Sequence, residues 1–155
     1  MSLKVGDAAP DFNLPDQDGT LVSLSSLLGE RVVIYFYPKD DTPGCTKEAC
    51  SFRDNWKRFE ENGIQVIGIS KDPATSHSKF IHKYQLPFTL LTDSEPCPVA
   101  SAFGSYGLKK FMGREYMGLM RHTFVINKEG KIEFIYLKVK ADQMAHQVLQ
   151  DLDLN

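Results

Sequence analysis

The fold of this chain is decided by the stretch Val32-Val-Ile-Tyr-Phe-Tyr37-Pro38-Lys-Asp-Asp-Thr42-Pro-Gly-Cys45-Thr-Lys-Glu48-Ala-Cys50. Its β-branched and aromatic beginning predicts a strand buried on both faces, and residues 47–61 predict a helix. The turn between them places Cys45 at the start of that helix. Backbone N–H groups at a helix start are unpaired and carry partial positive charge, so they stabilise a thiolate over a thiol. We therefore expect Cys45 to be a reactive cysteine.

The second cysteine, Cys50, cannot form a disulfide with Cys45 while both lie in a regular helix. Residues five apart in a helix are about 8–9 Å apart at Cα, whereas a disulfide needs roughly 4.4–6.8 Å. A bond between them requires the first turns to unwind, which indicates a redox switch and not a structural staple. Two alternatives stay open, namely a pair of inert buried thiols and a pair of zinc ligands. No second Cys/His pair with ligand spacing follows.

The apolar residues of the predicted helix form one stripe that should face the sheet. They recur at spacings of four, three, four and three along the chain. Cys45 is at the N-terminal end of this stripe, so its sulfur should point into the fold at the base of a pocket. Cys50 lies about 150° around the helix from the centre of this stripe, on the flank or outer face. The stripe consists of Cys45, Ala49, Phe52, Trp56 and Phe59.

Strands and helices alternate along the rest of the chain without a linker. Strand–helix–strand order implies a right-handed parallel crossover, and the C-terminal part adds an antiparallel hairpin and a covering helix. We predict an N-terminal hairpin over 11–24 with its turn at 16–19, a helical turn over 25–28, strands over 31–37, 64–70, 89–91, 122–126 and 131–138, helices over 47–61, 73–84 (capped by Asp72), 99–103 and 142–152, and a loop over 105–119.

This order predicts an α/β fold, namely a thioredoxin-like three-layer α/β/α sandwich with an N-terminal β-hairpin extension. The length of 155 residues suits one domain over 1–155. Ordinary thioredoxins carry a C-x-x-C pair and a proline at the strand that faces it. Here that strand begins at Arg121-His-Thr123, and a cation suits a peroxide better than a protein disulfide.

Composition limits the partners and the compartment. A net charge of −2 gives no indication of a nucleic acid or of an anionic membrane surface as a partner. No apolar run is long enough to span a bilayer, and the first residues do not resemble a secretion signal. Three cysteines, an odd number, do not suggest a secreted disulfide framework. We therefore expect a reducing compartment, the cytoplasm by default; a plastid protein with a trimmed transit peptide would look the same.

The motif Pro38-x-x-x-Thr42-x-x-Cys45 resembles the active-site motif of peroxiredoxins. The second cysteine five residues later is similar to that of the Q-type subfamily, also called bacterioferritin comigratory proteins. The resemblance covers nearly the whole chain, and its further segments are 4–12, 66–70, 88–93 and 116–126.

The resemblance implies a thioredoxin-dependent thiol peroxidase that needs no bound cofactor or metal. Cys45 would be the peroxidatic cysteine that attacks hydrogen peroxide or an organic hydroperoxide and becomes a sulfenic acid. Cys50 would resolve it as an intramolecular disulfide, which thioredoxin or a similar dithiol reduces. Thr42 would orient the peroxide, and Arg121 would hold the thiolate and the peroxide oxygens with its fork of donors. We expect a monomer.

Three supporting residues complete the predicted site. Pro38 would shape and dry the pocket, and the backbone N–H of Gly44 should point at the substrate from the helix start. Glu48 matches a family position near the active-site arginine, although a carboxylate in a first helical turn is also common for dipole reasons.

Several simpler interpretations remain. Thr42 could be only a helix N-cap, Arg121 could be a surface charge, and Cys97 is a weak rival to Cys50 as the resolving cysteine. The whole chain could instead be a redox sensor or a chaperone-like protein, or a zinc-binding module. The histidines, none of which has ligand-like pairing, are interpreted as surface or packing residues; they are His77, His82, His122 and His146.

Overall fold

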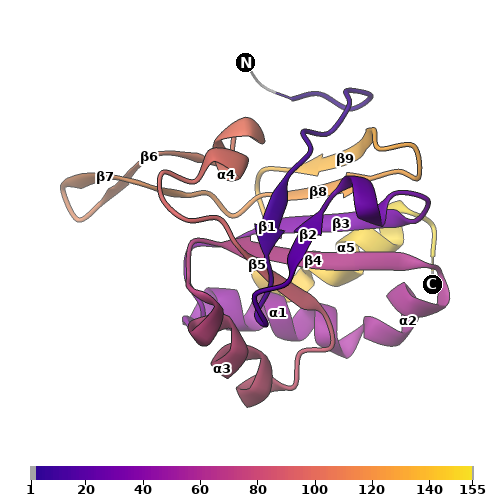
Figure 1. Cartoon of the computed structure of the whole chain (residues 1–155), viewed down its shortest axis with the longest axis horizontal. Coiled ribbons are helices and arrows are strands. Elements are labelled where there is room, and N and C mark those ends of the chain that lie inside the picture. Colours follow the sequence, from indigo (N-terminus) through magenta and orange to yellow (C-terminus); the bar gives the residue numbers. More distant parts are fainter. Residues whose placement is uncertain (1–2, 155) are drawn as a thin grey trace.

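The computed structural model describes residues 3–154 (Figure 1). In this part of the chain a five-stranded sheet has the order β5-β4-β3-β8-β9. The strands β3, β4 and β5 are parallel, and β8 and β9 add antiparallel to the other side of β3. This topology confirms the predicted thioredoxin-like α/β fold. The strands are β3 (Arg31–Phe36), β4 (Ile64–Ser70), β5 (Thr89–Thr92), β8 (Thr123–Ile126) and β9 (Ile132–Tyr136).

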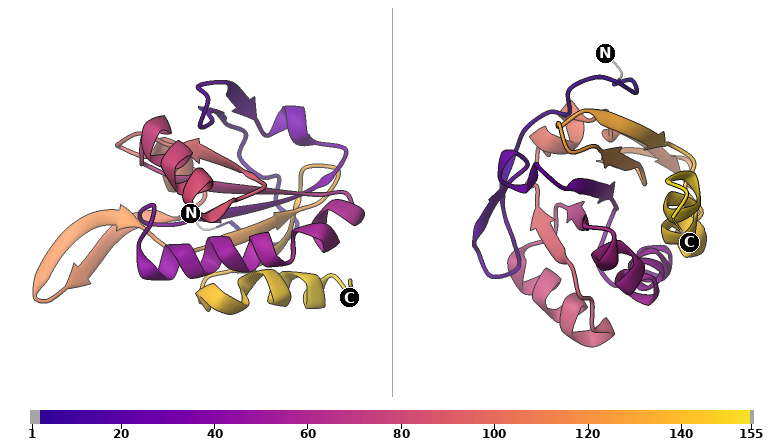
Figure 2. Two further views of the ribbon diagram at one scale, coloured as in Figure 1. Left: turned by 90° about the horizontal axis from the view of Figure 1, so that it is seen from below. Right: turned by 90° about the vertical axis from the view of Figure 1, so that its right-hand side faces the viewer.

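Helices cover one face of this sheet, and a smaller helix with the N-terminal extension covers the other. The first face carries α1 (Pro43–Asp54), α2 (Trp56–Glu61), α3 (Ala74–Tyr84) and α5 (Met144–Asp151), which follows the 3₁₀ turn η2 (Ala141–Gln143). The second carries α4 (Pro98–Ala102), the hairpin of β1 (Asn13–Pro15) and β2 (Leu21–Ser23), and the 3₁₀ turn η1 (Ser25–Leu27). Figure 2 shows α1 and α5 side by side along the sheet.

The two cores follow from the alternation of side chains along the central strand β3. Val33 and Tyr35 point toward α1 and α5, while Val32, Ile34 and Phe36 point toward α4 and the N-terminal segment. All five side chains are almost fully buried, because each face of the strand is covered. This explains why the sequence here is apolar without a gap.

Tyr35 requires a glycine on the neighbouring strand. A Cβ built on Gly68 of β4 would lie 2.8 Å from Tyr35 Cζ and 2.7 Å from Leu90 Cδ2, so no larger residue fits. The Tyr35 ring also stacks on Phe52 of α1, with centroids 5.0 Å apart. This contact packs α1 against the sheet.

Two helix predictions are wrong in detail. The helix predicted over 47–61 begins earlier, at Pro43, and is interrupted at Asn55, which divides it into α1 and α2. Asp72 does not cap α3: that helix begins at Ala74 after Pro73, and the Asp72 carboxylate accepts hydrogen bonds from Asp40 N–H and Ser70 Oγ instead.

The segment 105–119, predicted as a loop, is a β-hairpin of β6 (Tyr106–Phe111) and β7 (Arg114–Leu119). It projects from the body of the molecule (Figure 1). Its glycines indicated a break, but Gly113 serves the hairpin turn, where Met112 and Gly113 both have positive φ, as a two-residue type I′ turn requires. None of the helices in residues 3–154 has the length and apolarity needed to cross a membrane.

Candidate active site

Cys45 lies in the first turn of α1, on the face packed against the sheet. Only 1% of its surface is exposed. The bond from Thr46 N–H to the Thr42 carbonyl, 2.8 Å, closes the first turn, and no side chain caps the amides that precede it, those of Gly44 and Cys45. The positive end of the helix dipole therefore meets the sulfur, an arrangement that favours the thiolate.

The guanidinium of Arg121 joins the sulfur to a buried carboxylate. Nη2 donates to Cys45 Sγ at 3.2 Å, and Nη1 donates to Glu48 Oε1 at 2.9 Å. A Cβ on Gly44 would lie 3.0 Å from Nη2, so the glycine leaves the space for this approach. Burial alone would lower the pKa of Arg121, but the facing Cys45 and Glu48 raise it overall, so the guanidinium stays charged. Its side chain is 23% exposed, so Arg121 is not a free surface charge.

The backbone on both sides of Arg121 is held by residues that the sequence did not indicate. Met120 N–H donates to the Ser105 carbonyl at 2.7 Å, and Phe36 N–H donates to the His122 carbonyl at 2.9 Å. Ser105 Oγ and His122 Nδ1 are 2.9 Å apart. Burial lowers the pKa of His122, so the imidazole is neutral at neutral pH and can pair with the hydroxyl without adding a charge beside Arg121.

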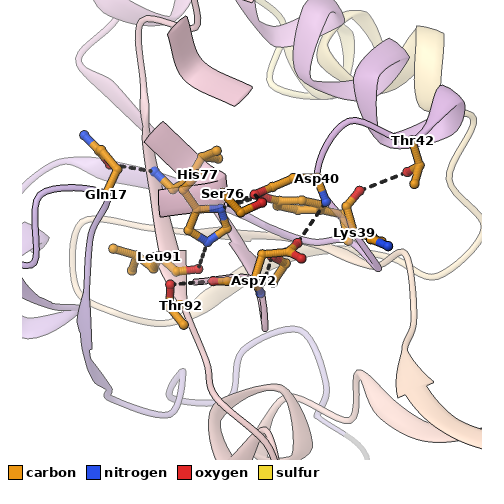
Figure 3. Close-up of polar contacts among 12 residues, drawn as sticks. Gln17, Lys39, Asp40, Thr42, Asp72, Ser76, His77, Leu91 and Thr92 are labelled. Atoms are coloured by element: carbon orange, nitrogen blue, oxygen red, sulfur yellow. Dashed lines mark hydrogen bonds and ion pairs between the residues drawn. The ribbon is translucent and has the colours of Figure 1, made fainter. Parts of the chain in front are cut away.

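Thr42 occupies the N-cap position of α1, but its side chain does not cap the helix. Its hydroxyl donates instead to the Lys39 carbonyl at 2.9 Å (Figure 3). The interpretation of Thr42 as a capping hydroxyl is therefore wrong. The bond to Lys39 uses the hydroxyl proton, so the oxygen lone pairs remain available to a ligand. Pro38, half-buried, follows directly on the buried Tyr37 at the end of β3.

Glu48 is fully buried, and within residues 3–154 its second oxygen, Oε2, has no hydrogen-bond partner. Burial raises the pKa of Glu48 to about 7, although the charge and hydrogen bond of Arg121 oppose the rise. The carboxyl group is therefore the part of the site whose charge changes near neutral pH.

This titration predicts a difference in stability between the protein and its Glu48→Gln variant. Between pH 4.5 and about 7 the unfolded chain releases the Glu48 proton while the folded protein keeps it. The free energy of unfolding should therefore fall relative to the variant as pH rises, by about 3 kcal/mol across that window. Urea unfolding of both proteins from pH 4.5 to 8 measures the difference, since the other groups cancel. Parallel curves would contradict the prediction.

The other two cysteines differ in their position relative to the sheet. All three cysteines are free. Cys50 is half-buried on the flank of α1, and burial raises its pKa. Cys97 precedes α4 and belongs to the core on the opposite face of the sheet from Cys45. It is completely buried, and burial raises its pKa to about 11. In residues 3–154 no group of three or more His, Cys, Asp or Glu side chains could hold a metal ion.

Comparisons with known proteins agree with this geometry. The model of the AhpC/TSA family matches residues 5–135. A putative peroxiredoxin Bcp of Coxiella burnetii is 48% identical over 149 residues, 96% of this chain and 98% of the relative. Peroxiredoxin Bcp of Bacillus subtilis is 46% identical over 152 residues, 98% and 96% of the two chains.

Solved structures of such proteins share the fold. The structure of peroxidoxin BcpB from Mycobacterium tuberculosis has a TM-score of 0.86 at 40% identity, with 97% of each chain covered. The bacterioferritin comigratory protein of Xanthomonas campestris has a TM-score of 0.87 at 34% identity, with 97% of this chain and 96% of that chain covered.

The peroxiredoxin relatives and the shared fold place the chain in the class of thiol peroxidases. The chain belongs to the AhpC/TSA family, among the homologues of Bcp and peroxiredoxin Q. It is a thiol-dependent peroxidase, which takes a hydroperoxide as substrate and a thiol as reductant.

Proposed function

We propose that Cys45 is the peroxidatic cysteine of this peroxidase. The single observation that carries the proposal is the 3.2 Å contact between Arg121 Nη2 and Cys45 Sγ at the uncapped start of α1. The guanidinium and the helix start both favour the thiolate, which is the nucleophile. The thiolate attacks one peroxide oxygen and the O–O bond breaks. The electron pair of the O–O bond goes to the other oxygen, which takes up a proton and leaves as an alcohol or water. Cys45 becomes a sulfenic acid.

Charge moves from sulfur to the leaving oxygen during this step, so the site must stabilise both ends. Arg121 presents several donors and is charged throughout. The amides of Gly44 and Cys45 add two more at the helix start. The Thr42 hydroxyl can accept a hydrogen bond from the peroxide O–H, which would orient the peroxide for attack. Pro38 and Glu48 support the site, the first by shape and the second by holding Arg121 at 2.9 Å.

The resolving cysteine in this proposal is Cys50. Its thiol condenses with the sulfenic acid to give a Cys45–Cys50 disulfide and water, after the first turns of α1 unwind. Two observations support Cys50 over Cys97: it shares the helix of Cys45 and is half-buried, whereas Cys97 is completely buried on the far side of the sheet.

Mapping the disulfide formed after one equivalent of peroxide tests this assignment. Peptide mass analysis should find Cys45 joined to Cys50 and Cys97 unmodified. In Cys50→Ser the first turnover should be spared, while steady-state turnover with a dithiol reductant should fall at least about tenfold, because the intramolecular partner is lost. A Cys45–Cys97 bond, or full turnover of the variant, would contradict the assignment.

We propose further that hydrogen peroxide and organic hydroperoxides are substrates and that thioredoxin or a similar dithiol is the reductant. The related protein of Xanthomonas campestris is described as having alkyl peroxide reduction activity, which supports the organic substrates.

Three free cysteines suit a reducing compartment. The relatives named above are bacterial, which favours the cytoplasm and lends no support to a plastid. We expect a monomer.

A further inference from the structure

The loop that leads from β3 to Cys45 is attached to helix α3 at two successive aspartates. Asp40 is held near the start of α3 and Asp41 near its end. Figure 3 shows the first attachment, which lies between the loop, α3 and β5. Neither aspartate belongs to the motif from which the site was predicted.

The first attachment is a buried, hydrogen-bonded pair of side chains. His77, completely buried, places Nδ1 2.7 Å from Asp40 Oδ2, which also accepts a bond from Ser76 Oγ at 2.8 Å. Its Nε2 lies 3.1 Å from the Leu91 carbonyl. Both ring nitrogens thus lie within hydrogen-bonding distance of an oxygen atom. Tyr37 Oη donates to the other oxygen, Asp40 Oδ1, at 2.5 Å.

The backbone of the same loop residue is fixed as well. Asp40 N–H donates to Asp72 Oδ2 at 2.8 Å, and the carbonyl of Asp72 accepts a bond from Thr92 Oγ1 at 2.7 Å. Asp40 is therefore fixed through its side chain to α3 and through its amide to the segment between β4 and α3, which is itself tied to β5.

The second attachment is exposed and holds a strained residue. Asp41 has a φ of +57°, the left-handed region that a non-glycine residue seldom adopts. Lys83 Nζ donates to Asp41 Oδ2 and Tyr84 Oη donates to Asp41 Oδ1, both at 2.8 Å. These two bonds keep the loop in its strained turn four residues before Cys45.

We propose that helix α3 is a clamp on this loop, and that the clamp sets the balance between the helical and the unwound start of α1. The proposal rests on the proposed function, in which Cys45 reacts while helical and reaches Cys50 only when unwound. Unwinding moves the residues from Thr42 to Cys45, whose upstream end the clamp holds. Asp40, Asp41, His77 and Lys83 are thus positioning residues: they touch neither sulfur nor peroxide, but they oppose the motion that resolution requires.

The clamp has opposite effects on two fates of the sulfenic acid. Condensation with the Cys50 thiol releases water and needs unwinding. Attack on a second hydroperoxide gives a sulfinic acid and an alcohol or water, and needs the helical site. A weaker clamp should therefore speed disulfide formation, lower the sulfinic acid yield and slow the first oxidation. A loss of stability remote from this loop would not shift the ratio of the two products.

The test uses variants of α3 with matched controls on the same helix. The double variant Lys83→Met, Tyr84→Phe removes the exposed attachment and keeps the Tyr84 ring against Phe80; Lys79→Met, exposed on α3, is its control. His77→Gln weakens the buried attachment, and His82→Gln, also exposed on α3, is its control. Quenched-flow mass analysis measures disulfide and sulfinic acid over a range of hydrogen peroxide concentrations.

The double variant should raise the ratio of disulfide to sulfinic acid about threefold, the size that an exposed pair allows. His77→Gln should raise it about tenfold, since a buried hydrogen bond to the Asp40 carboxylate is lost, and the controls should match the unchanged protein. An unchanged or lower ratio in the double variant would overturn the clamp, whether or not His77→Gln folds. Absence of the Cys45–Cys50 disulfide in the unchanged protein would instead overturn the proposed function.

Discussion

Cys45→Ser should abolish peroxide reduction, by at least about 10⁴-fold in the rate of the first oxidation. A serine hydroxyl at this position does not ionise near neutral pH, so the helix start and Arg121 have no nucleophile to stabilise. The sulfenic acid and everything that follows from it are then lost. Stopped-flow measurement of hydrogen peroxide consumption by the reduced protein, at one equivalent, reports this step without the reductant.

A second cysteine variant provides the control for this experiment. Cys97→Ala removes a completely buried thiol from the other core, and it should cost stability while leaving the rate of first oxidation within about twofold, because the sheet separates it from Cys45. If Cys45→Ser reacted at an appreciable rate, or if Cys97→Ala reacted as slowly as Cys45→Ser, the assignment of the peroxidatic cysteine would be wrong.

The parts of the site that the sequence predicted well are those with local signals. An apolar run marks β3, and the helical spacing of the apolar stripe marks α1, although that helix begins at Pro43, earlier than predicted. The turn between them therefore had to place Cys45 at a helix start. The hairpin turn at 16–19 was equally local, and Gly19 N–H does donate to the Asp16 carbonyl. In these segments each residue's preference agrees with the fold.

The errors in the elements arose where one residue type has two uses. Glycine breaks a helix or strand, but it also makes a tight hairpin turn, as at Gly113. Read as a breaker, it concealed the hairpin of β6 and β7. Asn55 divides α1 from α2 inside a pattern whose apolar spacing continues through Trp56 and Phe59. Periodicity alone carries no sign of that division.

The contacts that position the site were out of reach of local patterns. Arg121 meets Cys45 across 76 residues of sequence, and only the predicted fold and the resemblance to a family indicate it. Asp40 meets His77 across 37 residues. His77 was interpreted as a surface or packing residue because it has no spaced partner along its own helix. The sequence around Asp40 does not indicate which helix its carboxylate will contact, because the order of strands in the sheet determines which helix lies beside this turn.

Arg121→Met should slow the first oxidation about 10³-fold, the effect of losing a charged donor that stabilises both ends of the reaction. The variant removes the 3.2 Å contact to Cys45 and leaves Glu48 buried without its partner. The pKa of Glu48 should then rise further, so that it becomes neutral at pH 7. Stopped-flow oxidation of the reduced variant, measured against peroxide concentration, gives the rate.

A matched control and a companion variant separate the charge from the fold. Arg31, at the start of β3, forms another arginine–glutamate pair, with Glu133 at 2.9 Å, and lies far from the Cys45 thiol. Arg31→Met breaks this pair and should leave the rate unchanged. Arg121→Lys keeps the charge but cannot reach both Cys45 and Glu48 with a planar fork. Its rate of first oxidation should therefore lie between that of Arg121→Met and that of the unchanged protein. If Arg121→Met and Arg31→Met oxidised equally fast, the guanidinium would have no part in breaking the O–O bond, and the helix start alone would have to activate the thiol.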